Sequence, residues 1–411
     1  MPHTSIAHTG AAYFMNLEDR HSAHNYHPLP VVLNKGEGVY VWDVEGKKYL
    51  DFLSGYSAVN QGHCHPRIVD SFISQAKKLT LTSRAFHNDQ FGEYAQYITN
   101  LFRYDKVLPM NTGVEAVETA IKLARRWAYT VKGIPDEKAQ IIVCEQNFHG
   151  RTTTVISFSS DTSARKNFGP YMEGFISIPF NDLAALEKVL NEKNIAAFLV
   201  EPIQGEAGVV VPDEGYLHAA KLLCEKANVL FMADEIQTGL ARTGKMLACD
   251  HEEVHPDVLI LGKALSGGMM PVSAVLASNE VMDLIKPGEH GSTFGGNPLA
   301  CRVAMESLRV IVDENLAGNA EKMGAYFRES IGKMNLPYLK LVRGKGLLNA
   351  IVIDHTDKEA AWEICLLMMK NGLLAKPTQG DRIRLAPPLI INQLQVDEAL
   401  GIIEKSVRSF Q

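Results

Sequence analysis

The sequence predicts an α/β protein with a mostly parallel central sheet, helices on both faces of that sheet, and a smaller α+β domain at the C-terminal end. Three observations support this fold class. Between about residues 56 and 290, short apolar runs alternate with helical patterns, which is typical of strands joined by crossover helices. These runs are almost continuously apolar, as expected for strands covered on both faces. Past about Ser292 the alternation stops.

The N-terminal segment, residues 1–55, is rich in turn residues and contains one hairpin pattern, "GVYVWDVEGKKYLDF" at residues 38–52. Val39, Val41 and Val44 flank a turn near Glu45 and Gly46. Apolar residues on either side of such a turn indicate two paired strands. We therefore treat residues 1–55 as a separate N-terminal unit.

The large domain, residues 56–290, contains several strand candidates and two clear helical patterns, at residues 113–131 and 215–227. Ligands of open parallel sheets bind at the carboxyl ends of the strands, so we expect the functional residues to follow the apolar runs. The strand candidates are "KVLPM" (106–110), "QIIVCE" (140–145), "GFISIPF" (174–180), "IAAFLVEPI" (195–203), "NVLFMADEI" (228–236), "DVLILG" (257–262) and "PVSAVLAS" (271–278).

The C-terminal domain, residues 291–411, begins with two long helical patterns at residues 297–314 and 319–334. They precede a strand region at 339–353, a helix near 358–371, the stretch "DRIRLAPPL" and a final helix. This order of elements predicts a small α+β domain.

Composition excludes several classes of function. The formal net charge of −6 offers no basic field for nucleic acid or anionic lipid. No apolar run approaches the roughly 20 residues of a membrane helix. The first nineteen residues contain no Lys or Arg, so neither a secretory signal nor an Arg-rich transit peptide is visible. Together with six scattered cysteines that form no CxxC pair, this favours a cytoplasmic location.

The first unusual strand end follows "KVLPM". There Thr112, Gly113 and Val114 open a helix, and the free N–H groups of such a helix start can bind a phosphate. An ordinary helix capped by Asn111 or Thr112 is the alternative interpretation.

The second unusual strand end follows "QIIVCE". The segment "NFHGRT" there places Phe148 and Arg151 close together. An aromatic side chain at this edge is suited to stacking on a planar ring, and an arginine can bind a carboxylate through two parallel hydrogen bonds. The alternative is a core phenylalanine beside polar surface residues.

Asp234 and Lys263 are charged residues at the ends of two further apolar runs. A buried carboxylate needs a cation or several donors, although Asp234 is equally suited to capping a helix. Gln237, three residues on, supplies another hydrogen-bonding group. Lys263 is either a surface lysine on a turn or an amine nucleophile that forms an imine.

These features together match the needs of pyridoxal 5′-phosphate. A lysine forms an imine with its aldehyde carbon, and a carboxylate keeps its pyridine nitrogen protonated. An aromatic side chain stacks on its ring, and a helix start binds its phosphate. We therefore predict pyridoxal phosphate as the cofactor and no metal.

Long stretches of the chain resemble the class III (omega) aminotransferases, which have the type I fold of pyridoxal-phosphate enzymes. The resemblance covers nearly the whole chain, and its main block is "FMADEIQTGLARTGKMLACDHEEVHPDVLILGKALSGGMMPVSAVLAS". Residues 24–66, "HNYHPLPVVLNKGEGVYVWDVEGKKYLDFLSGYSAVNQGHCHP", and residues 200–212, "VEPIQGEAGVVVP", are similar to the members that act on ornithine. The resemblance implies a transaminase that moves the δ-amino group of L-ornithine to 2-oxoglutarate, giving glutamate-5-semialdehyde and glutamate.

The resemblance also implies roles for the candidate residues. Lys263 corresponds to the lysine that forms the imine, and Asp234 to the partner of the pyridine nitrogen. Ser292 and Thr293 resemble phosphate contacts that a neighbouring subunit lends, which implies a homodimer with shared active sites. The remaining implied cofactor contacts are Thr112, Gly113, Val114, Phe148, His149 and Gln237.

Five residues would select the substrates. The resemblance implies that Arg151 binds the α-carboxylate of ornithine and that Tyr26 and Tyr56 contact its α-amino end. Arg384 would bind the carboxylate next to the reacting carbon of 2-oxoglutarate. Glu206 would mask Arg384 through an ion pair until that substrate arrives, so that ornithine does not react through its α-amine.

Three points stay open at this level. His149 stands where some members carry a larger aromatic residue, so the local shape of the pocket is not fixed by the resemblance. N-acetylornithine and 4-aminobutyrate are alternative substrates, although the combination of Tyr56 and Glu206 favours free ornithine. "HEEVH", residues 251–255, matches a zinc-protease pattern, but the following Pro256 disfavours the helix that this motif needs.

Overall fold

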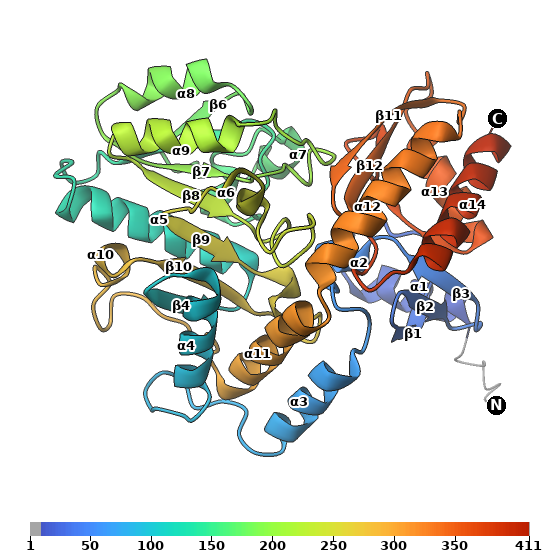
Figure 1. Ribbon diagram of the computed structural model, residues 1–411, viewed down its shortest axis with the longest axis horizontal. Coiled ribbons are helices and arrows are strands. Elements are labelled where there is room, and N and C mark those ends of the chain that lie inside the picture. The colour runs from blue at the N-terminus through green and yellow to red at the C-terminus, as the bar shows by residue number, and fades with distance from the viewer. Residues whose placement is uncertain (1–9, 411) are drawn as a thin grey trace.

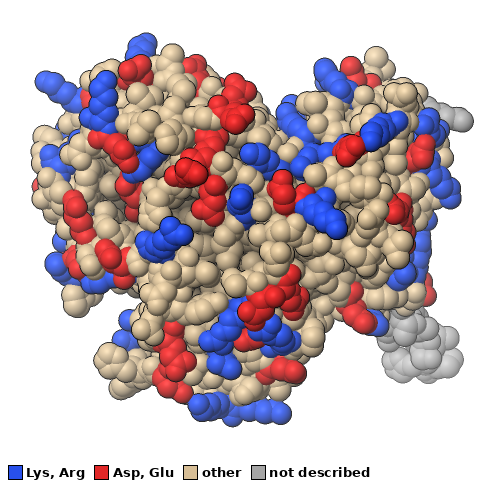
Figure 2. All heavy atoms as spheres, viewed as in Figure 1, with Lys and Arg blue, Asp and Glu red and all other residues tan. Residues whose placement is uncertain are grey.

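The structure is a computed structural model that describes residues 10–410. Figure 1 shows two lobes, a larger one built on strands β4 to β10 and a smaller one that holds the C-terminal strands beside the N-terminal ones. Figure 2 shows acidic and basic side chains interspersed over one face of both lobes. Among the residues described, no helix is both long and apolar enough to cross a membrane.

The large lobe is built on a seven-stranded sheet with the order β4-β10-β9-β8-β7-β5-β6. Neighbouring strands from β6 to β9 are parallel, whereas β10 is antiparallel to both β9 and β4. The prediction of a mostly parallel sheet is confirmed. The strands are β4 (Lys106–Met110), β5 (Gln140–Cys144), β6 (Phe175–Ile178), β7 (Ile195–Val200), β8 (Leu230–Asp234), β9 (Val258–Leu261) and β10 (Ser273–Ala277).

Helices join these strands or pack beside them. Figure 1 shows α8 and α9 on one side of the sheet, α5 on the other, and α11 beside α3 and α4. These elements are α2 (Ser54–Ser57), α3 (Pro66–Ala76), α4 (Phe91–Phe102), α5 (Gly113–Thr130), α6 (Thr153–Ile156), α7 (Thr162–Arg165), α8 (Leu183–Leu190), α9 (Tyr216–Lys226), α10 (Asn279–Met282), α11 (Pro298–Asp313) and the short 3-10 helices η1 (Ala248–Glu252) and η2 (Lys263–Ser266).

Cover on both faces explains why the strands are continuously apolar. In β7, Ala197 and Leu199 belong to the core on the α5 side, whereas Phe198 and Val200 belong to the core on the α8 and α9 side. Successive side chains of a strand point to opposite faces. A strand buried on both faces therefore needs an apolar residue at nearly every position.

The small lobe has an antiparallel sheet with the order β11-β12-β15-β14. Three helices accompany this sheet, as predicted for an α+β domain. The elements are α12 (Leu316–Lys333), β11 (Leu339–Lys345), β12 (Leu348–Ile353), α13 (Ala360–Asn371), β13 (Leu373–Leu374), β14 (Lys376–Thr378), β15 (Arg382–Leu385) and α14 (Gln393–Ser409).

A further four-stranded sheet, β1-β2-β3-β13, joins the N-terminal segment to the C-terminal lobe. The predicted hairpin is present as β2 and β3, and its turn contains Gly46 with a φ of 84°. Strand β13 pairs in parallel with β3 and places Leu373 opposite Leu50. The N-terminal elements are α1 (Ala11–His21), β1 (Leu33–Glu37), β2 (Tyr40–Asp43) and β3 (Lys48–Asp51).

Candidate active site

A cavity of about 190 Å³ lies at the carboxyl edge of the large sheet. One water molecule takes up roughly 30 Å³ in the liquid, so this cavity can hold a small organic molecule. Strands β4, β5, β7, β8 and β9 all end near it, and eight of the predicted site residues line it. The lining residues are Gly113, Val114, Phe148, His149, Gly150, Glu201, Glu206, Asp234, Ile236, Gln237, Thr238 and Lys263.

Lys263 enters the cavity from the loop after β9. Gly262 is extended, and Lys263 has a φ of 45° where it begins η2. This left-handed conformation costs a residue other than glycine roughly 1–3 kcal/mol and is a feature of functional sites. Burial lowers the pKa of Lys263; Glu206 opposes this shift and Arg384 adds to it. The lower pKa favours the neutral amine, which is the nucleophilic form.

Asp234 ends β8 as a buried carboxylate, and His149 is its partner. The distance from His149 Nδ1 to Asp234 Oδ2 is 2.7 Å, and the Ile236 N–H donates to Asp234 Oδ1 at 3.1 Å. A carboxylate only accepts hydrogen bonds, so Nδ1 carries the hydrogen. Burial opposes protonation of His149, but the hydrogen bond and the charge of Asp234 outweigh it and raise the pKa of His149. The imidazole thus fixes the orientation of the carboxylate.

Glu201 also lines the cavity, although its sequence context indicates only a structural role. Its carboxylate accepts hydrogen bonds from the Phe148 N–H at 2.8 Å and the Gly205 N–H at 3.4 Å. Burial raises the pKa of Glu201 to about 7. These bonds hold the backbone of Phe148, whose ring centre lies 5.5 Å from the guanidinium of Arg151.

The start of α5 forms another part of the cavity wall. The Thr112 side chain and Glu115 form a reciprocal capping box, while the amides of Gly113 and Val114 lie in the first turn, where they have no partner within the helix. Gly150 has a φ of 126°, and a Cβ there would lie 2.4 Å from Val114. Only glycine allows the Phe148 loop to approach the helix start this closely.

Arg384 and Glu206 form an ion pair beside the cavity, with Arg384 Nη1 2.5 Å from Glu206 Oε1. Gln237 contacts both partners, since its Nε2 donates to Glu206 at 3.3 Å and its Oε1 accepts from Arg384 at 3.5 Å. Burial opposes ionisation of Glu206, but Arg384 outweighs burial and lowers the pKa. The structure thus brings Glu206 and Arg384 together, as masking of the arginine requires.

Tyr56 lies next to this ion pair, and its ring centre is 4.9 Å from the Arg384 guanidinium. It has a left-handed φ of 60°, and burial raises its pKa. Tyr26 and Arg151 are close enough to perturb the same hydroxyl. Both of these side chains are exposed, so they belong to the entrance rather than to the cavity wall.

Ser292 and Thr293 do not line the cavity of their own chain. Ser292 Oγ accepts hydrogen bonds from Asn111 Nδ2 at 2.8 Å and from the Gly295 N–H at 3.1 Å. Thr293 is exposed. The segment therefore lies beside the start of α5 but presents Thr293 outward.

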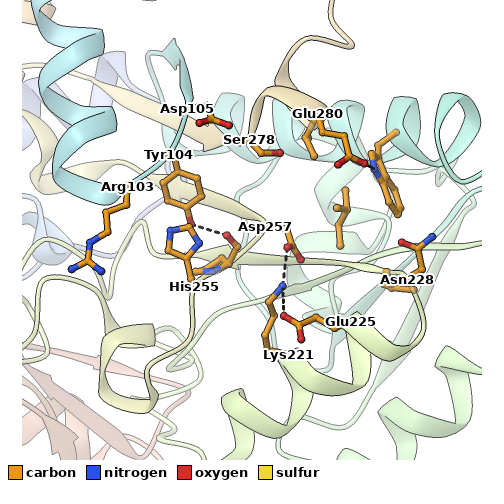
Figure 3. Close-up of a pocket in the computed structure, with 15 residues that line it drawn as sticks. Arg103, Tyr104, Asp105, Lys221, Glu225, Asn228, His255, Asp257, Ser278 and Glu280 are labelled. Atoms are coloured by element: carbon orange, nitrogen blue, oxygen red, sulfur yellow. Dashed lines mark hydrogen bonds and ion pairs between the residues drawn. The ribbon is translucent and has the colours of Figure 1, made fainter.

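A second hollow, of about 380 Å³, lies at the opposite edge of the sheet, among residues that precede β8 and β9. Figure 3 shows Lys221 joined to both Asp257 and Glu225, at 2.8 and 3.2 Å. His255 stacks on Tyr104 there, with ring centres 4.4 Å apart. The predicted site residues are absent from its lining, so we place the chemistry in the smaller cavity.

The "HEEVH" segment does not form the helix that a zinc-protease motif needs. The 3-10 helix η1 ends at Glu252, and Glu253 has a left-handed φ of 55°. His251 contacts the Thr243 carbonyl at 2.9 Å, whereas His255 stacks on Tyr104. The two histidines therefore face different surroundings. Within residues 10–410, no group of three or more His, Cys, Asp or Glu side chains is arranged to hold a metal ion.

Comparison with known proteins identifies the family. Residues 21–407 match the Aminotransferase class-III family, and the chain belongs to it. It is 60% identical to the mitochondrial ornithine aminotransferase of Rattus norvegicus over 97% of this chain and 91% of that one.

Two solved structures are also similar. An ornithine aminotransferase from Toxoplasma gondii has a TM-score of 0.96 at 49% identity, and covers 98% of this chain and 95% of its own. An acetylornithine aminotransferase from Elizabethkingia anophelis has a TM-score of 0.90 at 60% identity, with coverage of 97% and 99%. These matches confirm the family and the fold inferred from the sequence.

One expectation from the sequence is wrong. The composition and the first nineteen residues favoured a cytoplasmic location, but the animal relatives are named as mitochondrial enzymes. A transit peptide is recognised by its composition and is removed from the mature protein. The composition of the folded residues therefore does not reveal the compartment.

Proposed function

We propose that this aminotransferase uses pyridoxal phosphate to transfer the δ-amino group of L-ornithine to 2-oxoglutarate, giving glutamate-5-semialdehyde and glutamate. The observation that carries the proposal is a single cavity that holds Lys263 and Asp234 and adjoins the Glu206–Arg384 pair. Relatives named ornithine aminotransferase, about 60% identical over nearly the whole chain, support the choice of amino donor.

The residues present fit the cofactor. Asp234, oriented by His149, offers a carboxylate to the pyridine nitrogen, and the amides of Gly113 and Val114 with the Thr112 cap offer donors to the phosphate. Phe148 would stack on the pyridine ring. Gln237 would hydrogen-bond to the cofactor on the side of the ring that carries the 3-hydroxyl group. When bound, pyridoxal phosphate supplies an aldehyde carbon for amines and a protonated ring that withdraws electrons. Ornithine aminotransferase from Toxoplasma gondii is described with this cofactor at its active site.

Lys263 has two tasks in this proposal. Its neutral amine, favoured by the lowered pKa, would hold the cofactor through an imine to the aldehyde carbon, with release of water. When not bonded to the cofactor, the same amine would act as the base that moves the proton at the carbon bearing the transferred nitrogen.

Substrate choice depends on which carboxylate reaches which arginine. Arg151 at the entrance would bind the α-carboxylate of ornithine, and Tyr26 and Tyr56 would contact the α-amino end, so that the δ-amine points toward Lys263. Glu206 neutralises Arg384 during this half of the reaction. 2-Oxoglutarate needs Arg384 close to the cofactor, and its own carboxylate then replaces that of Glu206.

We also propose that the enzyme is a homodimer with shared active sites. Ser292 and Thr293 would contact the phosphate bound by the partner chain, which accords with the outward position of Thr293. Phe294, next to Thr293, is 56% exposed and would join such a contact. We also propose that residues 1–55, 56–290 and 291–411 are three units of the chain. The enzyme as a whole would serve proline synthesis and arginine metabolism.

N-acetylornithine is the second candidate substrate, because the similar Elizabethkingia anophelis structure is named for it. The test is to mix purified yellow enzyme with ornithine and, separately, with N-acetylornithine, and to follow the loss of the cofactor's visible absorbance. Faster bleaching by ornithine supports the proposal. Faster bleaching by N-acetylornithine would replace it with the second candidate.

A further inference from the structure

Arg242 is the largest side chain that is fully buried among the described residues. It follows two consecutive residues with left-handed backbone, Leu240 with φ of 56° and Ala241 with φ of 72°. Burial lowers its pKa to about 9, and although Asp51 opposes this shift, the nearby Arg384 adds to it. A buried charge is costly unless it is well hydrogen-bonded, so its contacts require an explanation.

The guanidinium of Arg242 joins three segments of the chain. Its Nη1 donates to the Leu347 carbonyl at 3.0 Å and to the Pro387 carbonyl at 2.6 Å, and its Nη2 donates to Asn60 Oδ1 at 2.5 Å. The Leu347 N–H in turn donates to the Arg242 carbonyl at 3.1 Å. Arginine is suited to this task because its donors form a rigid planar fork.

Each joined segment carries or adjoins a residue of the proposed substrate site. Pro387 lies three residues after Arg384, and Leu347 precedes β12, which pairs with β15. Asn60 lies four residues after Tyr56, and its Nδ2 donates to the Leu240 carbonyl at 2.8 Å. Arg242 itself follows β8 and the cavity residue Gln237.

The backbones of the loop after β8 and of the turn before Leu347 also approach each other closely. A Cβ on Gly346 would lie 2.3 Å from the carbonyl carbon of Thr243, so the loop after β8 packs directly on the turn before Leu347. Leu389 N–H donates to the Asn60 carbonyl at 2.8 Å. Direct contacts therefore join the large-lobe loop, the Tyr56 segment and the Arg384 segment.

We infer that Arg242 is a positioning residue for the 2-oxoglutarate half of the reaction, because it fixes the Arg384 segment of the small lobe to the cofactor-binding loop of the large lobe. This inference rests on the proposed function. Lys263 and Asp234 lie at the strand ends, so attachment of the cofactor and bleaching at saturating ornithine depend much less on Arg242. Its link to the Tyr56 segment through Asn60 would affect the KM for ornithine instead.

The test uses Arg242→Lys, which keeps the charge but cannot span three acceptors in fixed geometry. Single-turnover bleaching at saturating ornithine should stay within threefold of wild type, while the KM for 2-oxoglutarate should rise about tenfold or more. Glutarate, a dicarboxylate that cannot react, provides a readout without turnover. The rise in Tm that glutarate causes in the wild-type holoenzyme should shrink in the variant.

Arg328→Lys is the matched control. Arg328 also donates to a carbonyl beside this turn, that of Gly346 at 2.7 Å, but it reaches from α12 and contacts neither Pro387 nor Asn60. It should leave both half-reactions unchanged. If Arg242→Lys does not fold, Asn60→Ala carries the same test, since it removes one acceptor of Arg242 and the donor to the Leu240 carbonyl.

Equal losses in both half-reactions, or no change in either, would overturn the inference, as would the same split in Arg328→Lys. A wild-type enzyme that does not react with ornithine would refute the proposed function instead. In that case the glutarate shift still measures the role of Arg242 separately.

Discussion

Replacing Glu206 by glutamine should expose Arg384 to ornithine and weaken the choice between its two amines. Glu206 and Arg384 are 2.5 Å apart, and the arginine side chain is 3% exposed. At a charge separation of about 4 Å and an effective dielectric constant of about 20, such a pair is worth about 4 kcal/mol. Desolvation of both groups offsets part of this attraction.

If about half of that attraction masks the arginine, its loss amounts to ~2 kcal/mol, or ~30-fold in the ratio of δ- to α-transfer. The assay uses ornithine labelled with ¹⁵N only at the α-amine, and mass spectrometry then measures ¹⁵N in the glutamate formed. Wild type should give almost unlabelled glutamate, and Glu206→Gln should give a clearly labelled fraction.

Asp381→Asn is the control for this experiment, because Asp381 forms an exposed ion pair at 3.2 Å with the neighbouring Arg382 rather than with Arg384. It should leave the labelled fraction at the wild-type level. An unchanged ratio in Glu206→Gln would refute the masking role of the carboxylate.

Three further predictions concern the cofactor and the donor substrate. Lys263→Ala should lack the visible absorbance of lysine-bound pyridoxal phosphate, and its turnover should fall at least ~10³-fold. Normal turnover by this variant would refute the proposed role of Lys263. Tyr56→Ile should raise the KM for ornithine on the order of tenfold, the loss typical of one well-placed polar contact, and steady-state kinetics that match wild type would contradict its role at the α-amino end. The raised pKa of His149 means that its pairing with Asp234 stabilises the fold fully below about pH 6.5, the usual histidine value, and that this stability is lost as pH rises through the raised pKa. The Tm of cofactor-free protein should therefore fall with rising pH more steeply in wild type than in His149→Gln, and parallel curves would exclude this linkage.

The fold was predictable from the sequence because strand burial on both faces leaves a continuous apolar signature. The direction of β10 was not, since an apolar run such as residues 271–278 reads the same whether its strand is parallel or antiparallel. β1 was missed because its sequence, "LNKGE", is mostly exposed and has no apolar alternation. The pairing of β13 with β3 depends on contacts between distant parts of the chain.

The cavity residues at strand ends were predictable because they directly follow the apolar runs that mark the buried strands. The partners of these residues were not. His149 contacts Asp234 across 85 residues of sequence, and Glu201 contacts the Phe148 backbone across 53. Nothing in the sequence indicated that Arg242 is buried, because an arginine with no carboxylate close by in the sequence looks like any surface arginine. Side-chain partnerships of this kind follow from the packing of whole elements.

The shared sheet of the two chain ends has a consequence for synthesis of the protein. Lys47 Nζ donates to the Met369 carbonyl, 322 residues further along the chain. Strand β3 pairs with β13 across a similar separation in sequence, with Leu50 opposite Leu373. The edge of β3 that pairs with β13 therefore stays unpaired until almost the entire polypeptide has been synthesised. Unpaired strand edges recruit other chains, so nascent chains of this enzyme should depend on chaperones, and truncation before Leu373 should yield aggregates rather than a smaller soluble enzyme.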